Sequence, residues 1–248
     1  MRYHTVITVS SVILCWELVF KGGYIPGLWD IISTFFILLV NPDFLYNLWT
    51  SIWRLIIGWS IGMVTGTSIG IVMGTNYHAR KLIMPLVSSL FPIPKIALLP
   101  LFVVLLGLGE ASKITTIFIG AFFPSIITAY SSVLRTPKTY IEAGRACGGH
   151  TYMIISKIIL PYNLPTIIQG FRTSGSLALT LLVAAEMLGA KYGLGHWIFL
   201  TGGEMDFAEM FAGIIWLSII GLSINWGVDY LRRTVCHWSA LSEGNDIK

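Results

Sequence analysis

Charged side chains are scarce in this sequence. Asp, Glu, Lys and Arg make up 11% of its 248 residues, whereas they make up about 25% of an ordinary soluble domain. Hydrophobic residues make up 55%, and the mean hydropathy is +0.76. This balance excludes a soluble globular domain and predicts a protein embedded in lipid. The formal net charge of +4 is interpreted as a topology signal for membrane insertion, in preference to a surface for an acidic partner.

Several chemical signatures are also absent. The three cysteines are scattered and the five histidines never fall within one helical turn of one another, so neither a disulfide framework nor a metal site is predicted. Nothing marks a catalytic nucleophile, although the sequence alone leaves a Ser-His-Asp set open. The chain has no Gly-x-x-x-x-Gly-Lys-Ser/Thr loop for nucleotide phosphates and no basic run interleaved with aromatics. We therefore expect no enzyme, no cofactor and no nucleic-acid partner.

An all-α membrane protein with about six transmembrane helices is predicted, because crossing the bilayer takes roughly 20 apolar residues. The predicted spans are residues 6–20, 55–73, 82–109, 114–134, 164–188 and 210–228. The third joins two short apolar runs across a kink at Pro92, Pro94 and Lys95. The first is interpreted as a span, since no small-residue cleavage site of a signal peptide follows it. Residues 29–40 are apolar but short, and they are interpreted as an interfacial helix.

The distribution of Lys and Arg predicts the orientation of these spans. With the N-terminus inside, the cytoplasmic segments carry ten of these residues and the outer loops carry three. Positive loops stay in the cytoplasm, so both termini are expected there. We divide the chain into an N-terminal span and interfacial segment (1–43), a main transmembrane domain (44–235) and a cytoplasmic tail (236–248). Residues 136–161 form the longest internal loop.

Glycines recur at every fourth position of the second predicted span. They are Gly58, Gly62, Gly66, Gly70 and Gly74. Steps of four drift by about 40° each on a helix of 3.6 residues per turn, so the glycines form a slowly winding groove. Small residues in a membrane helix let another backbone approach closely. Packing within the protein is the favoured interpretation, and a groove for helices that move beside a transport pathway is the alternative.

The internal loop contains a small, glycine-rich and basic segment between two apolar ones. Thr139 and Glu142 match a capping box, in which a hydroxyl at the helix start is followed three residues on by a carboxylate. Pro137 offers a competing start as the first helical residue. Gly148 and the glycine after it are expected to bend or end this helix. A short helix with so little side-chain bulk suits docking into a groove of another protein, although a plain interfacial loop helix would look similar.

This segment resembles the EAA motif of the permeases of ABC importers. The motif is Glu-Ala-Ala, three residues, Gly, nine residues and Ile-x-Leu-Pro. The matching residues here are Glu142, Ala143, Gly144, Gly148, Ile158, Leu160 and Pro161, and the one departure is Gly144 in place of the second Ala. Residues 91–101, 107–113, 185–190, 193–195 and 51–54 look like the nitrate/sulfonate/taurine branch of these permeases. The match runs from about residue 44 to 232.

The resemblance implies a type I importer permease in the inner membrane. Its partners would be a second permease copy, forming a homodimer, an ATP-binding cassette ATPase that hydrolyses the ATP, and an extracytoplasmic substrate-binding protein. The EAA residues would form a coupling helix that the ATPase moves. Glu142 would cap this helix and contact the ATPase, Gly148 would allow the bend, and Leu160 with Pro161 would anchor the return into the membrane. The substrates of the family include nitrate, sulfonates, taurine, bicarbonate and vitamin precursors.

Two features suggest where the pathway runs. Pro92, Pro94 and Pro100 are expected to free backbone carbonyls, which is tolerated in a membrane only where the backbone is buried or lines a cavity. Residues 91–100, including Lys95, are therefore expected beside the pathway. Glu186 is a costly charge within a span. It is interpreted either as a gate or substrate contact, or as a structural partner of Arg172 or of backbone donors, which is favoured.

A secondary carrier driven by protons or sodium is the alternative function. Such carriers place ionisable groups near the bilayer midplane. Only Glu17 and Glu186 are acidic and lie inside apolar runs, which is little for a proton relay.

Overall fold

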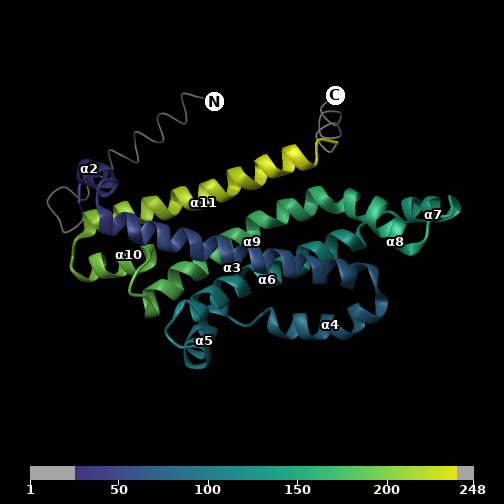
Figure 1. Ribbon diagram of the computed structural model, residues 1–248, viewed down its shortest axis with the longest axis horizontal. Helices are drawn as coiled ribbons and strands as arrows, with labels where there is room; N and C mark the ends of the chain where they lie inside the picture. The colour runs from purple at the N-terminus through teal and green to yellow at the C-terminus, as the bar shows by residue number, and fades with distance from the viewer. Residues whose placement is uncertain (1–25, 239–248) are drawn as a thin grey trace. The chain divides into compact units, whose positions relative to one another are not determined.

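The computed structural model describes residues 26–238, and these residues form helices and no strand (Figure 1). The helices that begin the described chain are α2 (Leu28–Leu38), α3 (Pro42–Thr75), α4 (Tyr77–Leu90), the 3₁₀-helix η1 (Lys95–Leu98), α5 (Leu99–Leu106) and α6 (Glu110–Leu134). They are followed by α7 (Lys138–Ala146), α8 (Thr151–Ile154), the π-helical turn η2 (Ile155–Ile159), α9 (Leu160–Gly189), α10 (Leu194–Gly203) and α11 (Phe207–Val235). The all-α prediction is confirmed.

Four of these helices are long and apolar enough to cross a membrane. They are α3, α6, the continuous helix Thr151–Gly189 that contains α8, η2 and α9, and α11. The spans predicted at 55–73, 114–134, 164–188 and 210–228 each fall inside one of them. The short apolar helix predicted at 29–40 corresponds to α2. The span predicted at 6–20 lies outside the described residues.

The span predicted at 82–109 is bent far more sharply than a kinked helix. α4 and the segment Lys95–Leu106 meet at 90° across a short break, as in a broken span or a re-entrant loop. Pro92 and Pro94 lie in this break, where each fixes φ and removes a hydrogen-bond donor. Pro100 does not interrupt the backbone, contrary to expectation. It sits in the first turn of α5, where the missing N–H has no helical partner to lose.

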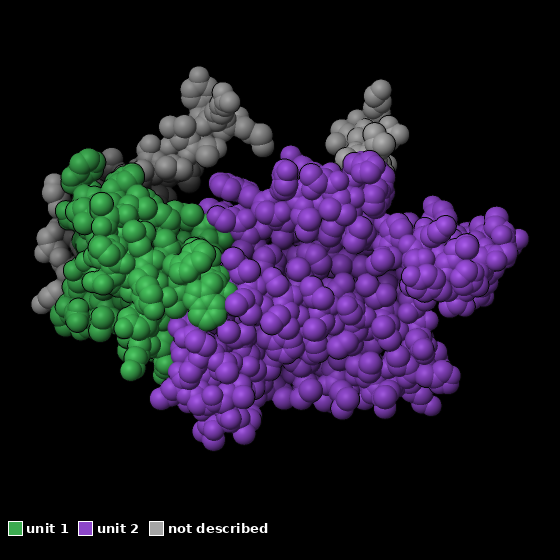
Figure 2. Space-filling model, in the orientation of Figure 1, with its two compact units in different colours: residues 1–53, 186–220 green, residues 54–185, 221–248 purple. Residues whose placement is uncertain are grey.

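The chain forms two compact units, which Figure 2 colours separately. Among the described residues, the first unit comprises 26–53 and 186–220, and the second comprises 54–185 and 221–238. The long helices α3, α9 and α11 contribute residues to both units. The core of the first unit is aromatic, because the Phe35 ring stacks on Trp216 at 4.9 Å and the Phe44 ring meets Trp197 edge-on at 5.4 Å.

In the second unit the glycine series of α3 lies directly against α6. A Cβ atom added at Gly62, Gly66 or Gly70 would lie 2.5–2.6 Å from a backbone carbonyl oxygen of α6. At Gly58 and Gly74 the nearest atom would instead be the Cβ of Ile117 or Val133, at 2.7 and 2.5 Å. The repeat therefore brings two membrane helices into backbone contact over four turns.

Candidate functional site

The segment that carries the EAA motif folds as a short exposed helix, α7, followed by a sharp turn. We call residues 136–161 the coupling element. α7 begins at Lys138 with Pro137 as its N-cap residue, and no side chain caps it. The predicted capping box is therefore wrong, because Thr139 already lies inside the first turn. Glu142 is exposed within the helix and does not cap it. Pro137, with φ −59°, sets the start instead.

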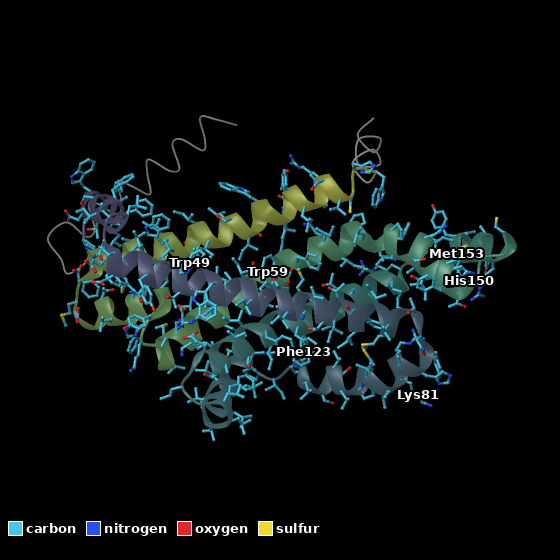
Figure 3. The ribbon with its side chains drawn as sticks, in the orientation of Figure 1. Trp49, Trp59, Lys81, Phe123, His150 and Met153 are labelled. Atoms are coloured by element: carbon cyan, nitrogen blue, oxygen red, sulfur yellow. The ribbon has the colours of Figure 1, made fainter. Side chains whose placement is uncertain are left out.

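The turn after α7 depends on Gly148. Its φ is +80°, a conformation in which a side chain is strained. The Gly148 N–H donates to the Arg145 carbonyl and the Gly149 N–H to the Gly144 carbonyl, both at 2.9 Å. This pair of hydrogen bonds is a Schellman motif, which satisfies the last carbonyls of α7 and reverses the chain. His150 and Met153, labelled in Figure 3, follow on the turn and on α8.

Small residues let α7 pack closely against η2 within the coupling element. A Cβ added at Gly144 would lie 2.5 Å from Cδ1 of Ile158, so the space of the missing methyl group is filled by another residue of the motif. An open groove of about 420 Å³ lies between α7 and the segment α8–η2. Its lining includes Tyr140, Ala143, Met153 and Lys157. α7 itself buries no residue, so its surface is available to another protein.

Leu160 and Pro161 do not interrupt the helix where the chain returns towards the membrane. The helix continues from Thr151 to Gly189, and it widens into the π-turn η2, which ends two residues before Pro161. The Leu160 N–H donates to the Ile155 carbonyl, five residues back. A proline within a helix cannot donate and its ring crowds the carbonyl four residues earlier, and the wider turn before Pro161 accommodates this residue in a helix that continues to Gly189.

The bend between α4 and α5 borders an apolar cavity of about 490 Å³. Pro94 and Lys95 line it together with Phe91, Pro124 and residues of α9, whereas Pro92 and Pro100 are not among its lining residues. The Lys95 ammonium lies 4.7 Å from the centroid of the Phe91 ring and 5.2 Å from that of Phe123, which Figure 3 labels on α6. It also donates to the Phe91 carbonyl. Lys95 thus places one cation at an otherwise apolar cavity.

Glu186 is completely buried in the first unit and binds the start of α10. Its carboxylate accepts hydrogen bonds from the Ser51 hydroxyl at 2.7 Å and from the Gly195 N–H at 2.9 Å. The Ser51 oxygen accepts in turn from the Leu194 N–H at 2.7 Å. The Asn47 side chain accepts from the Gly193 N–H at 2.6 Å. An anion at a helix N-terminus meets free N–H groups and the positive end of the helix dipole, so these contacts hold α10 in place.

The described residues of the second unit include the ion pairs Arg54–Glu110 and Arg172–Asp229. Arg54, which is 2% exposed, donates to both carboxylate oxygens of Glu110 at 2.5 Å. This forked geometry is the strongest that arginine makes with a carboxylate. Arg172, suggested as a partner of Glu186, forms an ion pair with Asp229.

Sequence reasoning missed the contacts of Asn47 and Glu110, because their partners are 146 and 56 residues away along the chain. Glu110 lies in the segment 107–113 that resembles the family, which was the one signal for it. Within residues 26–238, no group of three or more His, Cys, Asp or Glu side chains could hold a metal ion.

Comparison with known proteins gives consistent matches over most of the chain. Residues 66–236 match the model of the family described as binding-protein-dependent transport system inner membrane component. The chain is 30% identical over 225 residues to a probable ABC transporter permease protein of Brucella melitensis, covering 90% of this chain and 92% of the relative. It is 31% identical over 240 residues to the putative aliphatic sulfonates transport permease protein SsuC of Bacillus subtilis, covering 95% and 87%. The taurine transport system permease protein TauC of Escherichia coli is 30% identical over 192 residues, covering 77% and 70%.

A solved structure has the same fold. The chain superimposes on an inward-facing structure of the MetNI methionine ABC transporter with a TM-score of 0.66 and 24% identity. The match covers 80% of this chain and 96% of the other. The fold of a type I importer permease, expected from the EAA motif, is confirmed.

Proposed function

The chain belongs to the family of inner membrane components of binding-protein-dependent transport systems, and we propose that its coupling element docks a separate ATPase subunit. The prediction that the chain is a permease subunit of an ATP-driven importer is confirmed by these relatives, and the secondary carrier is not favoured. ATP hydrolysis belongs to the docked subunit in this proposal.

The observation that carries the docking proposal is the exposure of α7 on the side that faces away from Ile158 and the Val133 cluster. No residue of α7 is buried, Ala143 and Ala146 add little bulk, and the Schellman turn at Gly148 holds the helix back against α8. Exposed Lys138, Arg145 and Lys157 make the element basic. A rigid and thin helix can enter a groove that a bulkier helix would not fit. A groove on the ATPase with acidic side chains opposite Lys138 and Arg145 and a basic side chain opposite Glu142 would complement it.

We extend the proposal to the remaining partners and the topology. Two copies of the chain form the pathway, a substrate-binding protein delivers the solute, and both termini lie in the cytoplasm. The family description supports the binding protein, and the excess of Lys and Arg in the internal loops supports the orientation.

A small organic anion of the sulfonate or taurine type is the proposed solute. SsuC and TauC, which carry these substrates in their names, are each at least 30% identical to the chain. The cavity at Lys95 supports the proposal, because its apolar walls and one cation suit an anion with a short hydrocarbon part.

Replacing Gly148 with tryptophan, or Glu142 with lysine, is expected to release the ATPase. Tryptophan strains the φ of +80° and adds bulk at the tip of the element, and Glu142→Lys reverses an exposed charge on α7. The measurement is retention of the ATPase encoded beside this gene when the tagged permease is purified in mild detergent.

Matched controls separate docking from folding. Gly107 has the same φ of +80° with open space around it, so Gly107→Trp imposes similar strain elsewhere, and Glu204→Lys reverses an exposed charge far along the sequence. Both controls should keep the ATPase. Retention that ignores Gly148→Trp and Glu142→Lys, in folded protein, would contradict docking through this element.

Residues 91–100 are proposed to line the pathway, and this has its own test. A cysteine at Ile96, which lines the cavity, should react with a charged, membrane-impermeant thiol reagent in a variant without the native cysteines. A cysteine at Val104, which is 81% exposed on α5, is the comparison for the outer surface of the same segment. Labelling of Ile96→Cys should speed up or slow down when ATP and vanadate trap the transporter, whereas labelling of Val104→Cys should not. Protection of Ile96→Cys in every state would place this stretch against lipid and sink the proposal.

A further inference from the structure

Within the coupling element, the segment that joins α7 to α9 contains a turn that can flex. The π-turn η2 separates the four-residue helix α8 from the long helix α9. π-turns are rare, and their wider hydrogen-bond ring often marks a functional position in a helix. A displacement of α7 could be absorbed by flexing of this turn before it reaches α9, unless another contact bridges the turn.

Asn163 makes that contact. Its side-chain nitrogen donates to the Ile159 carbonyl at 2.8 Å and to the Thr136 hydroxyl at 2.7 Å. Ile159 is the last residue of η2, and Thr136 immediately precedes the N-cap residue of α7. One amide group therefore ties the end of the π-turn to the start of the coupling helix.

This hydrogen bond is shielded from water. Asn163 is 3% exposed and Thr136 is 7% exposed. Loss of one partner would leave the other buried and unpaired, which costs more than an exposed hydrogen bond is worth. The buried hydrogen bond from the Asn163 amide to the Thr136 hydroxyl is therefore a stable contact between α9 and the start of the coupling element.

The other contacts around Asn163 are apolar, and they do not set the orientation of α7 relative to α9. Val133, Ile154 and Ile159 form a buried cluster, with Ile141 and Ile158 packed against it. Hydrophobic contacts of this kind hold the segments together, but they are non-directional and tolerate sliding. The hydrogen bond of Asn163 to Ile159 stays within the helix Thr151–Gly189, whereas its hydrogen bond to Thr136 is a directional contact with the residue that precedes the N-cap of α7.

α9 packs closely against α6 on the far side of this point. At Gly170 the backbone of α9 approaches Thr128 of α6 so closely that an added Cβ would overlap the threonine side chain. Asn163 lies two turns before this contact. It is thus the point where the coupling element joins a firmly packed pair of helices.

We propose that Asn163 is a positioning residue that transmits displacement of the coupling element to α9, through Thr136 and Ile159. The proposal rests on the docking function above, since the ATPase must move the element. Without the amide, the exposed surface of α7 is unchanged, so the ATPase still binds and hydrolyses ATP. The π-turn then absorbs the displacement and α9 responds less.

The test uses the complete permease–ATPase complex in lipid nanodiscs and needs no knowledge of the solute. A single cysteine replaces Leu177, which is 44% exposed on α9 and lines the cavity, and it carries an environment-sensitive fluorophore. The probe is the change in emission when ATP and vanadate trap the closed ATPases. Asn163→Leu removes both donated bonds, and Thr136→Val removes one acceptor with little change of shape.

The expected result is a separation of hydrolysis from movement. Both variants should retain the ATPase and hydrolyse ATP at a rate close to that of the parent complex, while the emission change falls to less than half. Thr136→Ser keeps the hydroxyl and should restore it. Thr234→Val removes a hydroxyl whose hydrogen bonds to the described residues 26–238 stay within its own helix, and it should change nothing.

Each other outcome has a definite meaning. A full emission change in Thr136→Val and Asn163→Leu would overturn the positioning role and leave docking intact. Loss of the ATPase from these variants would make Asn163 a support of the docking surface, which also overturns the proposal. Failure of the parent complex to retain the ATPase would overturn docking itself. If Asn163→Leu does not fold, the comparison of Thr136→Val with Thr136→Ser decides.

Discussion

Replacing Gly70 with leucine is expected to prevent α3 from packing against α6 and to leave little folded protein in the membrane. An added Cβ would lie 2.5 Å from the Ile126 carbonyl oxygen, 2.7 Å from the Ala129 Cβ and 3.0 Å from the Tyr130 nitrogen. Two of these are backbone atoms of a helix, which cannot move aside singly. Glycine is about 0.8–1 kcal/mol less favourable than alanine in a helix, and leucine ranks close to alanine, so leucine gains somewhat less than this amount. Overpacking costs about 1–3 kcal/mol and occasionally more, and contact with a carbonyl places this site at the upper end of that range. The packing cost therefore exceeds the gain in helix propensity, and Gly70→Leu should lower the stability of the protein.

Gly227 provides the control for this prediction. It lies on the membrane helix α11, is exposed, and has no atom within 4 Å of an added Cβ. Gly227→Leu should therefore gain helix propensity without a clash and match or exceed the parent in stability. The measurement is the midpoint of thermal unfolding in detergent, followed by the loss of a monodisperse peak on size-exclusion chromatography. A midpoint for Gly70→Leu at or above that of Gly227→Leu would show that α3 and α6 are not in backbone contact.

The spacing of these glycines revealed the groove but not the helix that fills it. Glycines at every fourth residue show which face of α3 lacks side chains, because helix geometry alone determines that face. The partner is chosen by tertiary packing, and α6 contributes carbonyl groups that carry no sequence signal. Hydropathy likewise placed four spans within the observed helices. It could not distinguish a kink from the 90° bend beside Pro92 and Pro94, because both leave the same apolar runs.

The predicted capping box was wrong for a different reason. Thr139 and Glu142 have the right spacing, but Pro137 already fixes the backbone one residue before the helix starts. The hydroxyl nearest to that start, on Thr136, accepts a hydrogen bond from Asn163, 27 residues away. A local pattern cannot anticipate such a bond. The same limit applies to Ser51, whose partner Glu186 is 135 residues away.

Replacing Glu186 with leucine is expected to loosen α10 and lower the thermal stability of the permease. The carboxylate is fully buried, and its contacts include the Ser51 hydroxyl and the Gly195 N–H. Hydrogen bonds to a charged group contribute about 1.5–3 kcal/mol each, and buried donors are left unpaired when it is removed. A loss of a few kcal/mol corresponds to a fall of about 5–10 °C in the unfolding midpoint for a chain of this size. Glu204→Leu, at an exposed site in the same unit, should leave the midpoint unchanged.

Glutamine at position 186 separates the structural role from a gating role. Its single carbonyl oxygen can accept one of the two hydrogen bonds, and its amide group then faces the remaining donor, so Glu186→Gln should lose part of the stability that Glu186→Leu loses. Ser51→Ala removes the hydroxyl that links the carboxylate to the Leu194 N–H. Because Ser51 and Glu186 act in one network, the losses of Glu186→Gln and Ser51→Ala should be less than additive in the double variant. A Glu186→Gln protein with the parent's unfolding midpoint but without transport would reverse this assignment. The carboxylate would then act on the solute or on a gate, and the hydrogen bonds to α10 would serve to aim it.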